Sequence, residues 1–391
     1  MKLGRNDKCH CGSGKKYKKC HLDKENTGVP IEVMRYFQRK NAEHEMLRKA
    51  GIHIPLVPPI LFKEMSARAF GRKVYSNRPV EETFHMFLIA ILQEEIGISW
   101  WIEQQSLPPA DRHFIAICFE KFQEWIQKNN NTAKRLGKTN IWAAKPDGYS
   151  KSLLLLAFDV VSLSHMQKLP DSLLERLKSR NEYQGARYEI AIAAIFARLG
   201  CEITFTDEKS IGKRCEFIAK HSNGFILAVE VKSRHREGVL HETGNQPEQD
   251  KLLSASAVWR LFKDALEQNP KDVPFAVFID INSPLTPNIP FNEKPWVKEV
   301  KELVEDKLKN YPPEEYPLNA AFFTNFSYHY QTEKEAQQGE MIGVVVPHPK
   351  FPSPDPEFFG FLEGALNHYG FVPPVEFEKN SSDTGIPTIY D

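Results

Sequence analysis

Residues 214–232 read Arg-Cys-Glu-Phe-Ile-Ala-Lys-His-Ser-Asn-Gly-Phe-Ile-Leu-Ala-Val-Glu-Val-Lys. Two runs rich in β-branched and aromatic residues flank a Ser-Asn-Gly turn, and this pattern predicts a β-hairpin. The strands are expected near 214–220 and 225–232. The second strand is apolar until its last residues, where a glutamate and a lysine emerge together.

The length of the turn decides which residues face each other across the hairpin. A three-residue loop with glycine in the left-handed position pairs His221 with Phe225 and places Glu216 directly opposite Glu230. A two-residue Asn-Gly turn places Glu216 opposite Val231 instead. Two carboxylates side by side on neighbouring strands repel each other unless a cation lies between them. We favour the three-residue loop because it gives the two acids a common purpose.

The segments on either side of the hairpin extend this pattern. A helix is expected near 186–199 and a strand near 201–206. After the hairpin, a helix near 249–268 and an apolar strand near 275–281 are expected. This α-β-β-β-α-β order predicts a mixed sheet with helices on its faces, and therefore an α+β or α/β fold class.

Charged residues occupy two places where the surrounding pattern is apolar. Glu189 lies in the first turn of its helix and shares a face with Ile192 and Phe196, so we expect it to point toward the sheet. A carboxylate that complements the helix dipole is the simpler explanation, but it does not account for the apolar neighbours. Glu230 and Lys232 share one face of their strand. A surface ion pair at a strand end is the alternative to a metal ligand beside a charge-stabilising amine.

On these residues, segment 181–282 resembles the PD-(D/E)xK nuclease superfamily, which has the restriction-endonuclease-like fold. In that family a helix acid, a strand acid and an acid-x-lysine strand bind Mg²⁺. Carried over by position, the resemblance implies that Lys232 orients or activates the attacking water and stabilises charge on phosphate. It also implies that Mg²⁺ or Mn²⁺ is bound by Glu189, Glu216 and Glu230. The implied reaction is hydrolysis of phosphodiester bonds in nucleic acid.

This chain departs from the family pattern at one of the implied ligands. The family usually has aspartate at the position of Glu216, often after proline, whereas here Cys215 precedes a glutamate. Glutamate is one methylene longer, and ligand distances for Mg²⁺ are strict. A shifted, active site and an inactive site that keeps the fold are both open.

Basic residues flank the candidate site and suit a phosphate backbone of either DNA or RNA. Those expected to bind nucleic acid are Lys213, Arg214, Arg234 and Arg236. Gln249, at the start of the following helix, is a candidate for a further active-site contact. The stretch 237–248 contains glycine and acids and fits a solvated, flexible loop equally well.

A second group of ligand-type residues lies at the N-terminus. Cys9-His10-Cys11 is followed by Gly12-Ser13-Gly14, a lysine-rich stretch and Cys20-His21. Two close soft ligands, a glycine-containing turn and a second close pair are what a four-coordinate zinc site needs. A unit this small has no hydrophobic core, so a metal must hold it together. A disulfide is the alternative, but it leaves an odd cysteine and explains neither His21 nor the glycines.

Residues 5–21 resemble the SEC-C zinc knuckle found at the C-terminus of the SecA translocation ATPase. The resemblance implies that His10 points away and that zinc is bound by Cys9, Cys11, Cys20 and His21. In that family the knuckle is an adaptor that binds partners and performs no chemistry. Basic residues outnumber acids here, so the tip is expected to attract phosphate, an anionic lipid surface or an acidic protein.

Composition limits the remaining possibilities. At 391 residues, two or three domains are expected. The net charge is +0, so electrostatic steering toward nucleic acid must come from local patches. No apolar run is long enough to span a bilayer and no signal-peptide pattern is present, so a cytoplasmic protein without a membrane span is expected. The sequence indicates no oligomeric state.

Four parts are expected along the chain: a SEC-C-like zinc knuckle over 1–24, a helical region over 31–180, a nuclease-like α/β domain over 181–347, and a C-terminal helix with an irregular tail over 348–391. The predicted function is metal-dependent hydrolysis of nucleic acid, with the knuckle docking nucleic acid or a protein partner. An inactive nuclease-like adaptor that binds nucleic acid, ribosome or protein is the main alternative. A protein-export accessory factor is weaker, because the chain lacks a G-x-x-x-x-G-K-[ST] phosphate-binding loop.

Overall fold

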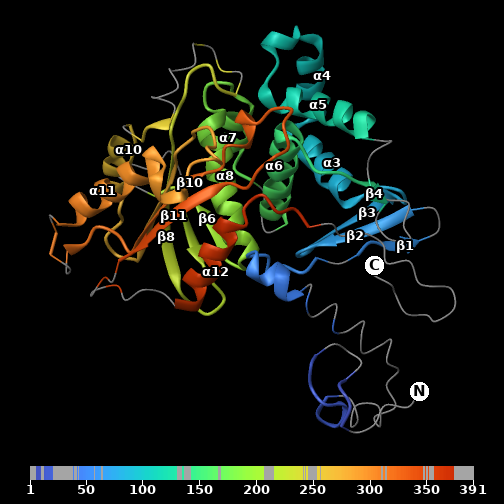
Figure 1. Cartoon of the computed structure of the whole chain (residues 1–391). Helices are drawn as coiled ribbons and strands as arrows, with labels where there is room; N and C mark the ends of the chain where they lie inside the picture. The colour runs from blue at the N-terminus through green and yellow to red at the C-terminus, as the bar shows by residue number, and fades with distance from the viewer. Residues whose placement is uncertain are drawn as a thin grey trace. The chain divides into compact units, whose positions relative to one another are not determined.

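The computed structural model describes most of the chain. The described residues are 6–9, 13–20, 38, 42, 44–56, 58–62, 65–129, 134–135, 142–165, 169–206, 215–240, 242, 244, 253–255, 257–309, 311–312, 315–346, 348, 351 and 356–373. The chain divides into two compact units (Figure 1). The first comprises Met1–Leu47, Arg135–Asn140 and Glu378–Asp391, and the second comprises Arg48–Lys134 and Ile141–Phe377.

In the first unit, a short hairpin carries one of the N-terminal cysteines. Lys8 and Lys16 form an antiparallel bridge, and Cys9, which follows Lys8, is buried. Gly14 turns the chain with φ of +71°, a conformation that a side chain with a Cβ rarely adopts. The 3₁₀ turn η1 (Tyr17–Lys19) follows the hairpin directly.

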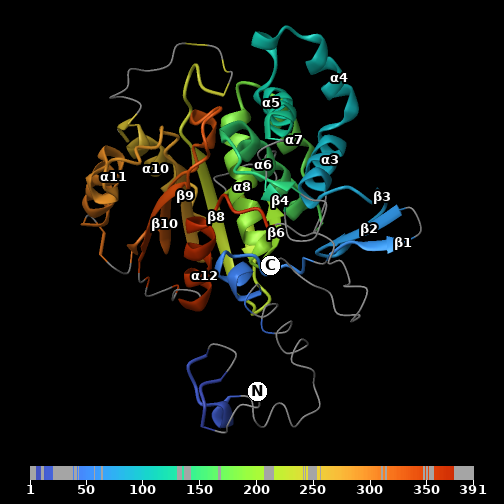
Figure 2. The same cartoon turned by 45° about the vertical axis from the view of Figure 1, so that its right-hand side comes forward.

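The second unit is built on a six-stranded mixed sheet (Figures 1 and 2) with the order β11-β10-β9-β8-β7-β6. β8, β9 and β10 are parallel, while β6, β7 and β11 pair antiparallel with their neighbours. The strands are β6 (Glu202–Phe205), β7 (Phe217–Lys220), β8 (Ile226–Ser233), β9 (Phe275–Asp280), β10 (Ala320–Asn325) and β11 (Glu340–Val345). The predicted α-β-β-β-α-β order is confirmed, because β6 to β9 are completed by α8 (Tyr183–Arg198) and α10 (Val258–Leu266).

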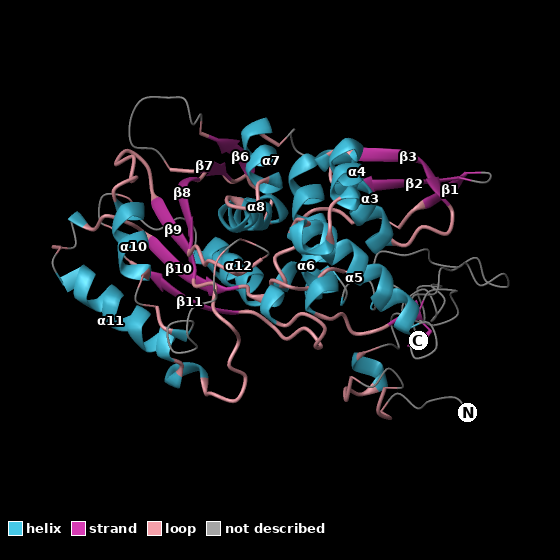
Figure 3. Ribbon diagram, turned by 90° about the horizontal axis from the view of Figure 1, so that it is seen from above, coloured by secondary structure: helices cyan, strands magenta, loops and turns pink. Residues whose placement is uncertain are grey.

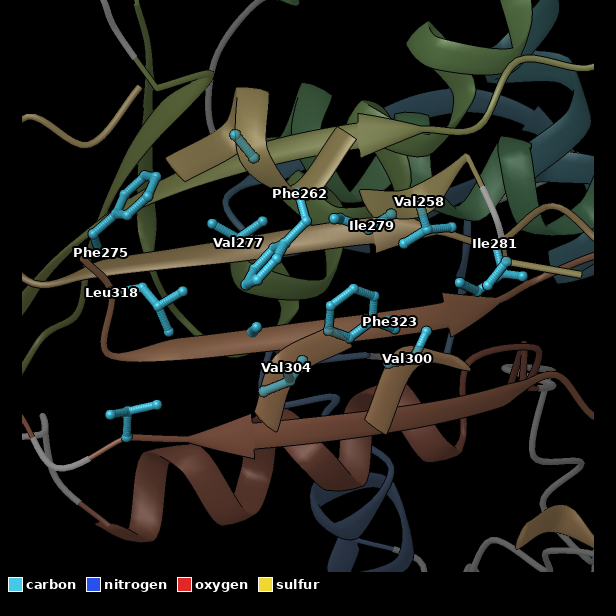
Figure 4. Packing of buried hydrophobic residues seen from close by; sticks show 14 of the residues in the cluster. Val258, Phe262, Phe275, Val277, Ile279, Ile281, Val300, Val304, Leu318 and Phe323 are labelled. Carbon is cyan, nitrogen blue, oxygen red and sulfur yellow. The ribbon is translucent and has the colours of Figure 1, made fainter. Parts of the chain in front are cut away.

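Helices cover both faces of this sheet (Figure 3), which makes it the middle of three layers. On one face, the ring of Phe196 from α8 lies 5.7 Å from the rings of Phe217 and Phe278, measured between centroids. On the other face, α10 and α11 (Pro295–Lys309) bury apolar side chains against β8, β9 and β10 (Figure 4). The residues in this second core include Val258, Phe262, Val277, Ile279, Val300 and Phe323.

Helices from the predicted helical region pack against α8 within the same compact unit. A buried ion pair joins α6 to α8, with Arg198 Nη1 2.7 Å from Asp159 Oδ1. The Tyr369 hydroxyl donates to Asp159 Oδ2 at 2.6 Å. The helices of this region are α3 (Phe84–Ile96), α4 (Ile98–Ser106), α5 (Phe114–Asn129), α6 (Gly148–Ser164) and α7 (Asp171–Lys178). Short elements elsewhere are β4 (Lys134–Arg135), β5 (Trp142–Ala143), η2 (Pro109–Asp111), η3 (Phe291–Glu293) and η5 (Tyr328–Tyr330).

The expectation that residues 31–180 are helical is wrong at 60–79, which forms a three-stranded antiparallel sheet. In its middle strand, buried residues alternate with more exposed ones, but two buried positions hold Ser66 and Arg68, which hides the period of two from a hydrophobicity pattern. The Arg68 guanidinium donates to the Glu82 carbonyl oxygen, so its charge has a polar partner. The strands are β1 (Ile60–Phe62), β2 (Met65–Phe70) and β3 (Lys73–Pro79).

The C-terminal helix is α12 (Pro356–Asn367), and it covers the same face of the six-stranded sheet as α8 (Figure 3). Its Phe359 ring stacks on Phe322 of β10 with centroids 6.5 Å apart. The tail beyond residue 373, predicted to be irregular, lies outside the described residues. Within the described part of the chain, no helix combines the length and apolar character needed to cross a bilayer.

Candidate active site

The β7–β8 hairpin has the register of the three-residue loop. The His221 N–H donates to the Phe225 carbonyl oxygen at 3.0 Å, and Gly224 adopts φ of +92°. The paired register ends at Phe217 and Val229, and Glu216 and Glu230 are the next residue on each arm. The predicted three-residue turn is confirmed, and Lys232 lies within 3.6 Å of both acids.

Glu216, Glu230 and Lys232 form a cluster on the sheet face covered by α10. Ala228, two residues before Glu230, packs in the core beneath that helix, and alternation along β8 puts both later side chains on the same face. Lys232 Nζ lies 2.5 Å from Glu230 Oε1 and 3.6 Å from Glu216 Oε1. The Glu230 side chain is 1% exposed, whereas Glu216 and Lys232 are 26% and 29% exposed. The cluster therefore has a buried acid at its base and solvent at its mouth.

The protonation of Glu230 is strongly affected by this position. Burial is the main cause that raises its pKa from 4.5 to about 7, the Lys232 ammonium opposes the rise, and the Glu216 carboxylate adds to it. Burial alone acts to lower the pKa of Lys232, but the two carboxylates outweigh burial and raise that pKa above its ordinary value. The amine therefore stays protonated, while the carboxyl titrates near neutral pH.

The carboxylate oxygens of Glu230 fit a cation. Neither oxygen accepts a well-aligned hydrogen bond from a described residue, although the Lys232 ammonium and the backbone of Glu216 both lie against the carboxyl. A buried acceptor without a donor is costly, and native proteins rarely retain one without a reason. Two oxygen-donor side chains from the two arms of one hairpin suit Mg²⁺ or Mn²⁺. Glu216 and Glu230 are therefore the side chains of this cluster that fit such an ion.

Glu189, the third acid of the predicted site, has a different partner. It lies on α8, its side chain is buried, and its Oε2 is 2.9 Å from Arg176 Nη1 on α7. Since α8 packs on the face of the sheet opposite to α10, Glu189 comes from the other side of the sheet than Glu230. Among the described residues, no three His, Cys, Asp or Glu side chains form a group that could hold a metal ion.

Two of the four residues predicted to contact nucleic acid are buried, whereas a residue that binds a nucleic-acid backbone at the surface is exposed. Arg234 and Arg236, which follow β8, are 8% and 3% exposed. The Arg234 guanidinium donates to the Ser254 carbonyl oxygen, and Arg236 Nε donates to the Asn282 carbonyl oxygen at 2.8 Å. The other two predicted nucleic-acid contacts, Lys213 and Arg214, lie outside the described residues, as does the candidate active-site residue Gln249.

The sequence reasoning missed a glutamine that fixes the segment after β8. Gln184, in the first turn of α8, donates through Nε2 to the Arg236 carbonyl oxygen and to Glu242 Oε2, both at 2.7 Å. Its Oε1 accepts from the Arg236 N–H at 3.0 Å and from Asn282 Nδ2 at 2.8 Å. A polar amide at the start of an otherwise apolar helix is the sequence signal that could have indicated this role. The described part of 237–248 is thus tied to α8, unlike the solvated loop that the composition also allowed.

The N-terminal unit contains two of the four predicted zinc ligands within the described residues. Cys9 is buried, and Cys20 is partly buried, with its Sγ 3.2 Å from Ser13 Oγ. The two other predicted ligands, Cys11 and His21, lie outside the described residues.

Comparison with known proteins identifies one motif. Residues 5–23 match the SEC-C motif, which confirms the predicted knuckle family for this segment. The chain is also similar to the solved structure of Pyrococcus furiosus SfsA in complex with Ca²⁺, with 20% identity and a TM-score of 0.19. That match covers 42% of this chain and 62% of the other, which is less than two thirds of its length. No curated protein matches the chain. The fold assignment accordingly rests on the chain's own topology.

Proposed function

We propose that the second compact unit hydrolyses phosphodiester bonds in nucleic acid, with Mg²⁺ or Mn²⁺ as its cofactor. One observation carries this proposal. Glu216 and Glu230, from the two arms of the hairpin, both lie against the Lys232 amine, and the buried Glu230 oxygens lack well-aligned donors. A structural ion pair at a strand end needs only one acid, so the second acid favours an ion that both carboxylates share.

In this proposal the chain's own residues divide the work. Glu216 and Glu230 hold the cation, which when bound polarises a phosphoryl oxygen and lowers the pKa of water. Lys232 acts as a donor rather than a base, because the two carboxylates raise the pKa of its amine. A cation between the acids would release the ammonium to hold the attacking water or a phosphate oxygen. There it would offset charge that develops in the transition state.

Glu189 completes the proposed set as a third carboxylate, provided that it exchanges its partner and reaches the cluster from the opposite side of the sheet. In the described arrangement its charge is balanced by Arg176 at 2.9 Å. Binding a cation through Glu189 therefore requires the guanidinium to move away, and the 27% exposure of the Arg176 side chain leaves it room to do so. Glu189 is accordingly proposed as a ligand that the cation recruits, rather than one already in place.

The test is cleavage by the purified full-length chain with Mg²⁺ or Mn²⁺. Lys232→Ala is expected to lower the cleavage rate of DNA or RNA by about 10²–10³-fold, as when a transition-state donor is removed. Lys263→Ala is the matched control, because Lys263 is an exposed lysine on α10 and its loss should leave the rate unchanged. Cleavage that survives in the Lys232 variant would contradict the role given to this amine.

A second candidate, an adaptor that binds nucleic acid, ribosome or protein without cutting, is favoured by the Glu189–Arg176 ion pair. A carboxylate whose charge is already balanced by an arginine does not need a metal ion to compensate it. In that case the wild-type chain binds nucleic acid with an affinity that falls steeply as salt rises, and it cleaves none. Salt-dependent binding without turnover therefore selects the adaptor.

We further propose that the N-terminal unit is a zinc knuckle that docks a partner or nucleic acid. Its ligands would be Cys9, Cys11, Cys20 and His21, a set that suits tetrahedral Zn²⁺. We expect about one zinc per chain by elemental analysis, lost in the Cys9→Ser/Cys20→Ser double variant and retained in Cys118→Ala, which changes a cysteine of the second unit. A zinc-free native protein would contradict the knuckle.

A further inference from the structure

We propose that the exposed indole ring of Trp259, on α10, stacks on an unpaired base of single-stranded nucleic acid. This inference rests on the proposed nuclease function and names its substrate class. Trp259 is 47% exposed, and among the residues of α10 and α11, all of which are described, no other large apolar side chain is this exposed. Two amines lie over its ring, with Lys307 Nζ 4.8 Å and Lys263 Nζ 5.8 Å from the ring centroid. These three residues, called the Trp259 platform, combine a flat aromatic face with two cations.

The helical period of α10 puts this ring at the edge of the buried stripe. Val258, Phe262 and Ala265 recur at the spacing of one helix face and are buried against the sheet. Trp259 follows Val258 by about 100° around the helix, and its side chain leaves the core on the side where Lys307 of α11 lies. A contact that only tied α11 to α10 would bury the ring, whereas nearly half of this residue faces solvent. Because burial of a large aromatic ring is favourable, an exposed one suits a partner from outside the chain.

The two amines of the platform are available to phosphate groups. Among the described residues, no carboxylate forms an ion pair with either Lys263 or Lys307. The attraction between an ammonium and a tryptophan face is weak at an exposed site, and the lysine stem is flexible. Both ammoniums can therefore move from the ring to the phosphates on either side of a stacked base. Acids such as Asp264 and Asp306 also lie on these helices, so the attraction comes from two amines rather than from a broadly basic surface.

The platform favours an unpaired strand over a duplex. In a duplex each base is stacked between its neighbours, so its faces cannot reach a side chain on the protein surface. The bases of a single strand expose these faces, and stacking on an aromatic ring tolerates any sequence because every base has such a face. A flat ring beside two phosphate-binding amines therefore defines single-stranded DNA or RNA as the substrate class.

The start of α10 lies at the same end of the sheet as the candidate active site. Val258 packs beside Ile279 of β9 (Figure 4), and Ile279 is paired with Lys232 of β8 in the strand register. Paired residues on parallel strands point to the same face, so Lys232 lies beside Ile279 on the face that α10 covers. A strand bound at the Trp259 platform would therefore continue past the start of α10 toward Glu230 and Lys232.

An anionic membrane surface is the other partner that an exposed tryptophan beside lysines could fit. A helix that lies on a membrane buries a whole apolar face, with several large side chains, in the lipid. Trp259 has no such neighbours on the solvent side of α10, which continues with Arg260, Lys263 and Asp264, all described and exposed. The arrangement therefore favours nucleic acid, and vesicles are included in the test.

The test measures binding by the full-length chain without added Mg²⁺ or Mn²⁺, so that no cleavage interferes. One oligonucleotide is compared as a single strand and as a duplex, and vesicles of phosphatidylserine and phosphatidylcholine are the third probe. We expect the single strand to bind more tightly than the duplex, and Trp259→Ala to weaken single-strand binding by about 5- to 100-fold. Trp259→Phe should retain most of this affinity, because phenylalanine keeps a ring for stacking.

The amines are tested through the salt dependence of binding. Lys307→Gln should reduce the slope of log affinity against log salt concentration by about 0.7, the value for one phosphate contact of a single strand. Lys263 and Lys307 act on affinity, so their loss leaves the cleavage rate at saturating substrate unchanged.

The control is Trp125→Ala, which removes a partly exposed tryptophan that stacks on Phe122 within α5 and should leave single-strand affinity intact. Equal losses in the Trp259 and Trp125 variants, or equal losses for single strand and duplex, would overturn the inference even if the chain cleaves nucleic acid. Binding to vesicles but to neither oligonucleotide would assign the platform to a membrane surface and overturn it as well. A single-strand preference that depends on Trp259, in a chain that never cleaves, would support the platform while refuting the nuclease proposal.

Discussion

Two buried acids on neighbouring parallel strands, Glu230 of β8 and Asp280 of β9, are treated very differently by the fold. Both are almost inaccessible to solvent, and burial is the main cause of a raised pKa in each. Asp280 Oδ2 lies 2.9 Å from Arg187 Nη2 and 3.3 Å from Ser233 Oγ, while its Oδ1 accepts the Asn282 N–H at 3.3 Å. Glu230 has only the Lys232 ammonium and the backbone of Glu216 against its carboxyl, and neither contact is a well-aligned hydrogen bond.

This difference separates a structural acid from a candidate ligand. Two of the three contacts of Asp280 reach other elements: Arg187 joins β9 to α8, and Ser233 joins it to β8. Glu230 has no buried cation from another element, and its neighbour on the other arm of the hairpin is a second acid, Glu216. A buried carboxylate whose acceptors are filled stabilises the fold, whereas one with open acceptors beside a half-exposed acid and amine suits a ligand from outside the chain.

The largest effect on the free energy of unfolding is expected from removing the structural acid, Asp280. Asp280→Ala removes all three contacts and leaves the Arg187 guanidinium buried without its carboxylate, which should cost about 3–5 kcal/mol of unfolding free energy. Urea unfolding followed by circular dichroism measures this loss. Asp264→Ala, at an exposed position of α10, should change stability by no more than about 0.5 kcal/mol. A loss below about 1 kcal/mol for the Asp280 variant would contradict the role of Asp280 as an acid that stabilises the fold.

A smaller, pH-dependent effect is expected from Glu230. Its folded pKa of about 7 exceeds the unfolded value near 4.5, so below pH 4.5 the carboxyl is protonated in both states and carries no penalty. As pH rises toward 7, the unfolded chain releases this proton first and the metal-free folded state loses stability, by about 3 kcal/mol at most.

Glu230→Gln should remove this pH-dependent loss, because the amide does not titrate. The difference between wild type and variant, measured by urea unfolding from pH 4.5 to 8, isolates this one group from other acids. Saturating Mg²⁺ should stabilise the wild type at neutral pH and leave the variant largely unaffected. Parallel curves for the two proteins would contradict the raised pKa, and an equal response to Mg²⁺ would contradict Glu230 as its ligand.

The sequence predicted the hairpin well because its cues are local. The Ser-Asn-Gly turn fixes which residues pair, and alternation along β8 then fixes the faces of Glu230 and Lys232. The element order from α8 to β9 could be read from the same kind of periodicity. The N-terminal knuckle was recognisable from ligand type and spacing over residues 5–23.

What could not be predicted depends on contacts between distant segments. The pairing of Glu189 with Arg176 follows from how α7 packs on α8. No local sequence pattern around either residue indicates this ion pair. Gln184 gains its role only because the segment after β8 folds back onto α8. The strand β2 was missed because polar side chains fill two of its buried positions, Ser66 and Arg68, so that hydrophobic alternation is absent.

The smallest expected effect separates the nuclease from the adaptor through Glu189. Arg176→Ala removes a partly exposed partner and should cost about 1–2 kcal/mol without metal, less than a fully buried pair because solvent screens the arginine. If Glu189 is a ligand that the cation recruits, Mg²⁺ should stabilise this variant more than the wild type, by about 1 kcal/mol, because the competing guanidinium is gone. Thermal unfolding at several Mg²⁺ concentrations measures the gain. The Arg176→Ala/Glu189→Gln double variant is the control and should show no extra gain. A response to Mg²⁺ equal to that of the wild type would make Glu189 a second structural acid, like Asp280, and leave Glu216 and Glu230 as the two acids of the site.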